Sequence, residues 1–349
     1  MEERPAPQPS KPQLSNDDYH VGWICALQEE LTAGSTMLDE KHEGPAEQDP
    51  NDHNTYFLGR IHKKHNVVMA ALPAGRYGKA ATATVASDMV RTFKNLRIGM
   101  LVGIGGGLPD LEDPDTLRLG DVDVSQPDGN YGGVIQYDIG KKEQGGYFRR
   151  QNGMLNSPPS SLLTALTALQ ATHDMEDSRM TSFISEAQRR YPKITRTGYT
   201  FPGAEKDHLF RSSALHIPDT RDCSGCDQNA RIPRVRVADD DTPDNSPRIY
   251  YGTILSADIV LKDSVERDRL IQVFQQEKVK ALCVEMEAAG LMNKFPCLVI
   301  RGICDYADSH KNDGWHKYAA LTAAAYAKEL LWFVSPGQMP HQPIQNIIG

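Results

Sequence analysis

The chain has 349 residues, of which 39% are hydrophobic and 24% are charged, so it is long enough to bury a sizeable core in one large α/β domain or two smaller ones. Its net charge of −8 argues against a nucleic acid or an anionic membrane as a partner, because both select a basic surface. No apolar run approaches the roughly 20 residues of a membrane span, and the polar N-terminus has no apolar signal segment.

The two ends of the chain differ in composition from its middle. Residues 1–18 are polar and rich in proline, and we expect them to form a disordered leader. Residues 335–349 are rich in proline and glutamine, and we expect a flexible tail there. The region between them, 19–334, has the alternating apolar and polar pattern of a globular domain.

Short apolar runs alternate with helical patterns in the first part of this domain. The pattern predicts, in order, a buried strand at 20–27, a helix at 28–38, a hairpin at 54–73, a helix at 78–93, a strand ending in glycines at 97–109 and another strand at 117–126.

The block at about 140–248 has a different character, since it is rich in Pro, Ser, Arg and Asp. It contains two helical patterns, at 160–175 and 179–192, and a predicted loop at 239–248. We interpret it as an elaboration beside the core of the domain.

Regular patterns return after this block. They predict a strand at 249–263, a strand running into a helix at 281–295, a buried strand at 296–308 and a long helix at 318–334. Buried strands separated by helices indicate an α/β fold with a parallel or mixed sheet.

Six cysteines are present, and four of them lie in apolar, core-like stretches. This usage predicts a reduced, cytoplasmic protein. The other two, Cys223 and Cys226, have the CxxC spacing. Because no second pair and no HxxxH motif accompanies them, a zinc or redox role and a plain loop both stay open.

Polar clusters follow four of the predicted strands, at 26–30, 103–107, 284–290 and 301–308. Each has a structural alternative: a helix start, a tight turn or a cap. The glycine run is not a GxGxxG motif that opens a helix, which disfavours a dinucleotide fold. Because ligands collect at the carboxyl ends of parallel strands, the four clusters together favour one site.

In order and spacing, these clusters resemble the purine nucleoside phosphorylase and nucleosidase superfamily. The motifs are ALQEE, VGIGGGLP with LRLGDVDVS, GTILSADIVLKD, VEMEAAG and IRGICDYAD. They look like the branch of methylthioadenosine/S-adenosylhomocysteine nucleosidases, and GGVIQYDIGK with FPCLVIRGICDYADSHKN is similar to its fungal members. The resemblance implies a three-layer αβα fold around a mixed, partly barrel-like sheet.

The resemblance also assigns chemical roles. Breaking a purine N-glycosidic bond leaves positive charge on the ribose and negative charge on the base. Asp305 matches the acid that protonates purine N7, which burial at a strand end would help it to do. Glu287 matches the carboxylate that accepts hydrogen bonds from the ribose 2′ and 3′ hydroxyls. An Asp at position 305 favours adenine as the base.

Other positions match the substrate pocket of the family. Met286 is implied to lie under the ribose, and Glu285 to lie nearer the base. Val260 and Leu261 match positions that frame the purine. The glycine run, with Gly105 and Gly106, would let the substrate approach the backbone.

The nucleophile is implied by the segment after the first strand. Phosphorylases carry a GDPxR-type loop there, whereas this chain has Glu30, which matches the glutamate that activates water. A carboxylate repels a phosphate dianion, so Glu30 favours hydrolysis. Arg301 matches an arginine that helps to hold the nucleophile. The chain departs from the family at Ile104, where the nucleosidases have a serine.

The group at the ribose 5′ end is left open by the sequence. Methylthio and homocysteinyl groups need an apolar pocket, whereas a nucleotide such as ATP needs cations. Four basic residues are candidates for binding a 5′ phosphate, and the alternative is that they are solvated surface charges: Arg76, Lys79, Arg149 and Arg150.

The sequence allows two alternatives to an adenine-releasing hydrolase. One is a phosphate-dependent purine nucleoside phosphorylase, and the other is a non-catalytic nucleoside-sensing domain of a larger signalling protein. The resemblance implies a homo-oligomer, either a dimer or a hexamer, and no cofactor or metal. Fungal relatives often carry this domain in front of NACHT, ankyrin or TPR regions, so fusion to such regions is expected.

Overall fold

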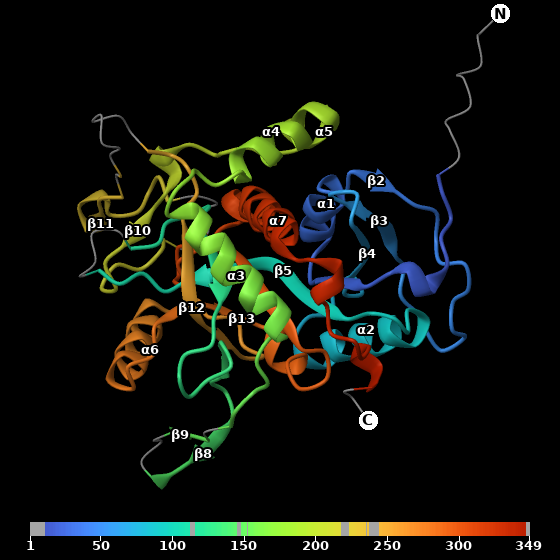
Figure 1. Cartoon of the computed structure of the whole chain (residues 1–349). Coiled ribbons are helices and arrows are strands. Elements are labelled where there is room, and N and C mark those ends of the chain that lie inside the picture. The colour runs from blue at the N-terminus through green and yellow to red at the C-terminus, as the bar shows by residue number, and fades with distance from the viewer. Residues whose placement is uncertain are drawn as a thin grey trace, which may run out of the picture.

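The computed structural model describes residues 11–111, 116–144, 148–151, 153–217, 223–234, 236 and 244–346. Its centre is a ten-stranded mixed sheet with helices on both faces (Figure 1). The strands follow the order β13-β12-β6-β14-β5-β1-β4-β3-β2, with β7 beside β12. They comprise β1 (Val21–Cys25), β2 (Glu40–Lys41), β3 (Phe57–Ile61), β4 (His65–Ala71), β5 (Ile98–Gly107), β6 (Val122–Ser125), β7 (Val134–Gln136), β12 (Ile249–Ser256), β13 (Ala281–Glu285) and β14 (Cys297–Asp305).

Strand β5 closes part of this sheet into a barrel. It runs parallel to β14 over most of its length, and its last residues, Gly106 and Gly107, pair antiparallel with Val284 and Cys283 of β13. The strands β13, β12, β6, β14 and β5 therefore form a closed path. This confirms the expected mixed, partly barrel-like sheet. The glycine run is part of a paired strand, in agreement with the strand expected at 97–109 and not with the alternative of a tight turn.

Helices cover the two faces of the sheet and complete three layers. On one face α7 contacts α1, α3 and α4, and α2 packs on the opposite face (Figure 1). Alternate residues of β1 point to opposite faces: Trp23 packs in the α7 layer and Ile24 in the α2 layer. The helices are α1 (Gln28–Thr36), α2 (Lys79–Thr92), α3 (Ser160–His173), α4 (Met180–Arg190), α5 (Pro192–Arg196), α6 (Ser264–Gln276) and α7 (His316–Phe333).

Smaller elements lie beside this core, most of them in the predicted elaboration at 140–248. The short strands are β8 (Gly140–Lys142) with β9 (Phe148–Arg150), and β10 (Leu209–Phe210) with β11 (Arg231–Ile232). The 3-10 turns are η1 (Asn16–Asp18), η3 (Ala204–Lys206), η4 (Gln228–Ala230), η5 (Ala288–Gly290), η6 (Asp313–Trp315), η7 (Pro336–Gln338) and η8 (Ile344–Asn346). Among the described helices, none is both long and apolar enough to cross a membrane.

Two helices differ from the expectations. The segment after β13 forms only the single turn η5, because the backbone amides of Glu287 and Ala288 donate to the Glu285 carboxylate and Gly290 lies against the backbone of Lys79. Helix α6 was not predicted. Its start is fixed by Asp263, whose side chain accepts hydrogen bonds from the amides at the helix N-terminus.

The described parts of the predicted leader and tail contact the domain. The Asn16 side chain donates hydrogen bonds to the backbone of Glu47 and Thr92. Ile344 is buried, and its amide donates to the Leu96 carbonyl. Residues of both segments thus contact the domain, the disordered leader and the flexible tail stay predictions, and 1–10 and 347–349 lie outside the described residues.

The contact between β14 and α7 gives a test of the fold. A Cβ atom added at Gly302 would lie 1.9 Å from the carbonyl oxygen of Ala319. We expect Gly302→Ala to lower the free energy of unfolding by about 1–3 kcal/mol, because strand and helix must separate. Urea unfolding measures this, with Gly44→Ala as the control, since a Cβ there meets nothing within 4 Å. Equal losses in the two variants would contradict the packing.

Candidate active site

A pocket opens where β5, β13 and β14 meet the loop after β1. The pocket and the open solvent at its mouth together span about 670 Å³ of empty space. Apolar side chains form much of its wall, and four residues with carboxylate side chains also line it. It is lined by Ala26, Leu27, Glu30, Tyr77, Ile104, Gly105, Gly106, Ile259, Val260, Leu261, Val284, Glu285, Met286, Glu287, Cys304, Asp305, Lys311 and His316.

Glu30 is held in place by backbone amides on two segments. Its Oε2 accepts hydrogen bonds from Ala26, at 2.6 Å, and from Leu27, at 3.0 Å, which also caps the start of α1. Its Oε1 accepts one from the amide of Ile104, at 2.9 Å. Burial raises the pKa of Glu30, and the nearby Arg301 guanidinium opposes that rise. The helix-start role and the pocket role therefore belong to the same side chain.

Arg301 is the cation at the centre of this group. It is fully buried, and its guanidinium forms ion pairs with Glu285 and, at 3.5 Å, with Glu287. It also donates to the carbonyl of Ile104 at 3.4 Å. Burial works against its charge, but the surrounding carboxylates raise the pKa of Arg301 overall. The arginine lies behind the pocket wall and does not line the pocket.

The two glutamates of the VEMEAAG motif have different surroundings. The Glu285 carboxylate accepts hydrogen bonds from the amides of Glu287 and Ala288 and pairs with Arg301, so its oxygens are engaged. Glu287 has weaker partners: the Gly78 amide is 3.4 Å from its Oε1. Burial raises the pKa of Glu287 to about 7, with Arg301 opposing this and Glu285 adding to it.

Asp305 ends β14 on another side of the pocket and is buried. Its Oδ1 accepts a hydrogen bond of 2.8 Å from the Ala307 amide. Its Oδ2 lies 2.8 Å from Nζ of Lys311 and accepts a hydrogen bond from the Cys304 thiol. Burial would lower the pKa of Lys311, but the Asp305 carboxylate raises it overall, so the ammonium ion is retained.

Glycines in β5 make room for these charges. A Cβ at Gly103 would lie 2.4 Å from Oε1 of Glu30 and 2.5 Å from Nη1 of Arg301. A Cβ at Gly106 would lie 2.9 Å from Oδ1 of Asp305. The strand therefore needs residues without side chains where the carboxylates and the arginine pass over it.

The structure brings together most of the site residues expected from the sequence. Arg301 is the exception, because it reaches the pocket only through its carboxylate partners. Where the family has a serine, the side chain of Ile104 lines the pocket, and its amide bonds Glu30. The expected residues on the pocket wall are Glu30, Ile104, Gly105, Gly106, Val260, Leu261, Glu285, Met286, Glu287 and Asp305.

The four basic candidates for a 5′ phosphate do not line the pocket. Lys79 forms ion pairs with two carboxylates, at 2.7 Å and 3.3 Å. Arg149 pairs with Glu143, and Arg150 pairs with Glu277. Arg76 is exposed. Local acidic residues pair with three of them outside the pocket, and their role as phosphate ligands stays a prediction.

Lys311 was not predicted as a site residue, and neither were Tyr77, Ile259 or His316, which also line the pocket. The available signal for Lys311 was its position six residues after Asp305 in the same loop. That spacing alone does not specify contact, because the intervening turn could direct the side chain away. Here Ala307 has a φ of 52°, in the left-handed region, and the chain reverses there.

Comparison with known proteins identifies the class of the fold. The chain resembles a solved 5′-methylthioadenosine/S-adenosylhomocysteine nucleosidase of Neisseria meningitidis, with a TM-score of 0.53 and 16% identity over 89% of this chain and 98% of that one. The fold is thus that of the nucleoside phosphorylases and nucleosidases, and the resemblance expected from the sequence is confirmed. No family model matches the chain.

The chain is also similar in sequence to three kinds of known protein. It is 45% identical over 334 residues to a nucleotide-binding leucine-rich repeat (NLR)-like protein of Hyaloscypha variabilis, covering 95% of this chain but only 31% of the relative. It is 25% identical over 318 residues to a 5′-methylthioadenosine/S-adenosylhomocysteine nucleosidase of Mycobacterium bovis, covering 89% and 95%. An 88-residue segment is 33% identical to an ATP nucleosidase of Escherichia coli, covering 24% and 17%.

Because the pKa of Glu287 is raised in the folded state, the free energy of unfolding should decrease as the pH rises. The folded pKa is about 7, against an ordinary value of 4.5. Between these values the folded state keeps a proton that the unfolded state has lost, so the free energy of unfolding falls as the pH rises. One such proton corresponds to a slope of about 1.4 kcal/mol per pH unit.

We expect Glu287→Gln to flatten this part of the stability curve, because glutamine does not titrate. Urea unfolding between about pH 5 and pH 7 measures the slope. Glu266→Gln, on the exposed face of α6, is the control and should leave the slope as it is. A slope as steep in Glu287→Gln as in the unchanged chain would contradict the assignment.

Proposed function

We propose that this domain hydrolyses the N-glycosidic bond of an adenine nucleoside and releases adenine. The observation that carries the proposal is the placement of Glu30, Glu287 and Asp305 around one largely apolar pocket. Breaking the bond requires an acid for the base, a carboxylate near the sugar and a base for water. The three carboxylates occupy separate positions that can serve these tasks.

Asp305 is the proposed acid for the departing purine. Its Oδ2 is the oxygen nearest Lys311, while its Oδ1 is fixed by the Ala307 amide. In the reacting form Asp305 carries the proton; once that proton passes to the departing base, the carboxylate that remains forms the ion pair with the Lys311 ammonium that the structure shows. Lys311 is therefore proposed as a positioning and electrostatic partner of Asp305.

Glu287 and Met286 are proposed to hold the sugar. The Glu287 carboxylate has only one close amide partner, so its oxygens are available to hydroxyl groups of a ribose. As the bond breaks, positive charge develops on the sugar, and its electrostatic attraction to the Glu287 carboxylate increases. Met286 offers a polarisable, uncharged surface to the same centre.

Glu30 is proposed to activate water. Its raised pKa increases its affinity for a proton, which suits a general base. Arg301 balances the charge of the group but is buried behind the wall, so it does not offer a phosphate dianion a direct cationic contact. A phosphate would instead meet Glu30 and Glu287. Hydrolysis is therefore favoured over phosphorolysis.

The substrate is proposed to be a nucleoside in preference to a nucleotide. Among the described residues of the pocket wall, the lysine or arginine is Lys311, which lies 2.8 Å from Asp305 and thus at the base end, and burial lowers the pKa of His316 beside it, which disfavours its charged form. The remaining wall includes the apolar side chains of Tyr77, Ile259 and Val260. Such a surface suits an uncharged 5′ group, such as a methylthio group, better than a triphosphate.

Adenine release from a panel of adenosine, methylthioadenosine, AMP and ATP tests the proposal. We expect the nucleosides to be cleaved faster than the nucleotides. Asp305→Asn should lower kcat by at least about 100-fold, because asparagine cannot donate the proton. Asp174→Asn, at the exposed end of α3, is the matched control and should keep the activity.

Two outcomes would overturn parts of this proposal. Faster cleavage of ATP than of the nucleosides would reject the apolar 5′ site and leave the hydrolase in place. Nucleoside binding by calorimetry without adenine release from any substrate would reject the enzyme, and it would support a sensing domain. A homo-oligomer and fusion to signalling regions, as in the much longer NLR-like relative, are also proposals.

Replacement of Lys311 tests its proposed contact with Asp305. We expect Lys311→Met to lower kcat by about 100-fold while KM changes little, because the charge acts after the substrate is bound. Lys311→Arg should recover most of the loss, since it restores a cation. Lys193→Met, on the exposed α5, controls for the loss of a surface lysine. A rise in KM without a fall in kcat would contradict the role of Lys311 as the electrostatic partner of Asp305. So would a failure of arginine to restore kcat.

A further inference from the structure

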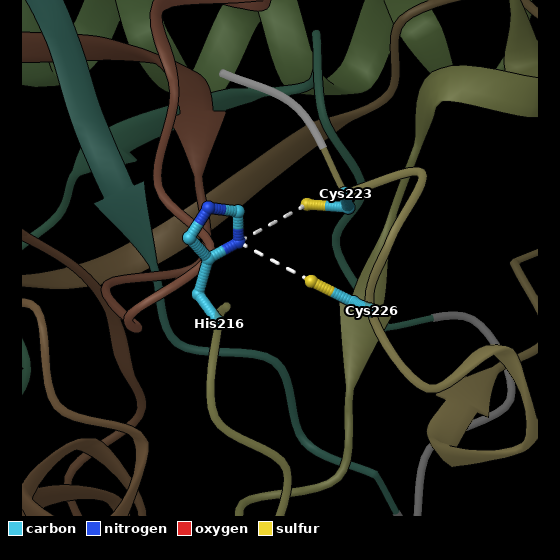
Figure 2. Close-up of side chains that lie close together, drawn as sticks. All are labelled: His216, Cys223 and Cys226. Carbon is cyan, nitrogen blue, oxygen red and sulfur yellow. Dashed lines mark hydrogen bonds between the residues drawn. The ribbon is translucent and has the colours of Figure 1, made fainter. Parts of the chain in front are cut away.

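A second group of chemically distinctive side chains lies outside the pocket, beside β10 and β11. Figure 2 shows His216 with a ring nitrogen directed at the sulfur atoms of both Cys223 and Cys226. Nδ1 is 3.4 Å from Sγ of Cys226 and 3.9 Å from Sγ of Cys223. One nitrogen and two sulfurs lie within 4.8 Å of one another. The CxxC spacing thus has the histidine partner that the sequence did not reveal.

These distances match the ligand set of a tetrahedral zinc ion. With Zn–S bonds of about 2.3 Å and Zn–N bonds of about 2.0 Å, nitrogen and sulfur ligands lie about 3.5 Å apart. The observed separations of 3.4 Å and 3.9 Å bracket this value. Thiolate and imidazole are also the ligands that zinc prefers. Three such ligands leave one tetrahedral position for water or a further side chain.

The backbone around the three residues is already organised. The Cys226 amide donates to the Cys223 carbonyl at 3.2 Å, which forms the turn of the CxxC segment. The Gln228 side chain donates to the carbonyls of both cysteines, at 2.9 Å and 2.8 Å. The two sulfurs therefore face the same side without further rearrangement, as a metal site requires.

His216 contacts the loop after β14. The His216 amide donates to Ser309 Oγ at 3.1 Å, and its ring meets that of His310 edge to face at 5.5 Å. The His310 ring is buried and stacks on Phe210 at 3.9 Å. Ser309 and His310 immediately precede Lys311, so the cluster lies against the loop that carries the proposed partner of Asp305.

The apolar core at this place is small. The buried cluster consists of Phe210 and the two cysteines, with Ala214 and Ala230 packed against it. The strands that border it, β10 and β11, are two residues long each. The burial of so little apolar surface contributes little to the stability of the chain around β10 and β11. Metal ligation commonly supplies the missing stability in such segments.

We propose that His216, Cys223 and Cys226 form a structural zinc site that holds residues 211–217 and 223–232 against the loop after β14. The site is independent of the proposed hydrolysis, and it binds zinc whether or not the pocket is catalytic. Its effect on the pocket is indirect, through the position of the loop that ends in Lys311.

Zinc content of the untagged, full chain tests the proposal. After purification without chelator, we expect about one equivalent of zinc per chain by elemental mass spectrometry. Cys226→Ser and His216→Ala should each lower this about tenfold or more, because two remaining ligands bind weakly. The controls are Cys297→Ala, a buried cysteine elsewhere in the core, and His53→Ala, an exposed histidine. Both should retain the metal.

Cobalt substitution separates metal ligation from a folding defect. With cobalt added to zinc-free protein, we expect a thiolate-to-metal charge-transfer absorption that is lost in Cys226→Ser while circular dichroism still reports a folded chain. Less than about a tenth of an equivalent of zinc together with no cobalt band would overturn the proposal. A Cys223–Cys226 disulfide in protein purified under reducing conditions would also overturn it.

Discussion

The arrangement of the pocket depends on one buried cation. Arg301 is fully buried at the centre of the sheet, and Glu30, Glu285 and Glu287 surround it. An isolated charge in such a place would be strongly unfavourable, so the arginine and the carboxylates are stable only together. Removal of Arg301 would leave this group of buried carboxylates without their shared cation. Arg301 therefore contributes to the position of Glu285 and Glu287, while backbone amides hold Glu30.

This constraint also explains the glycine-rich strand. Gly103 and Gly106 lie where the arginine, Glu30 and Asp305 cross β5, and a side chain there would occupy their space. The absence of side chains lets the end of β5 approach β13, and the pairing of Gly106 with Val284 closes the barrel. Closure brings the ends of β13 and β14 to one pocket. The glycines of β5 therefore contribute to three features: they make room for the buried charges, they allow the pairing with β13, and they place the site.

Much of this organisation could be predicted from the sequence, and the exceptions have physical reasons. Buried strands such as β1 and β14 are continuous apolar runs, and their polar ends marked the site. The pairing of β5 with β13 depends on residues far apart in the chain, so the sequence predicted the strand at 97–109 but not its partner at the glycine end. The contact of Lys311 with Asp305 depends on a left-handed turn at Ala307. The sequence pattern also does not show which carboxylates fold beside a basic residue, as Asp138 does beside Lys79, because the two lie far apart in the chain.

The central claim is that a carboxylate-lined pocket uses water and excludes phosphate. Adenine release from adenosine or methylthioadenosine, measured without phosphate and at rising phosphate concentration, tests it most directly when the sugar product is identified by mass spectrometry. We expect a rate that phosphate does not increase and a free sugar as product. A rate that rises in proportion to phosphate, with a sugar 1-phosphate as product, would contradict it.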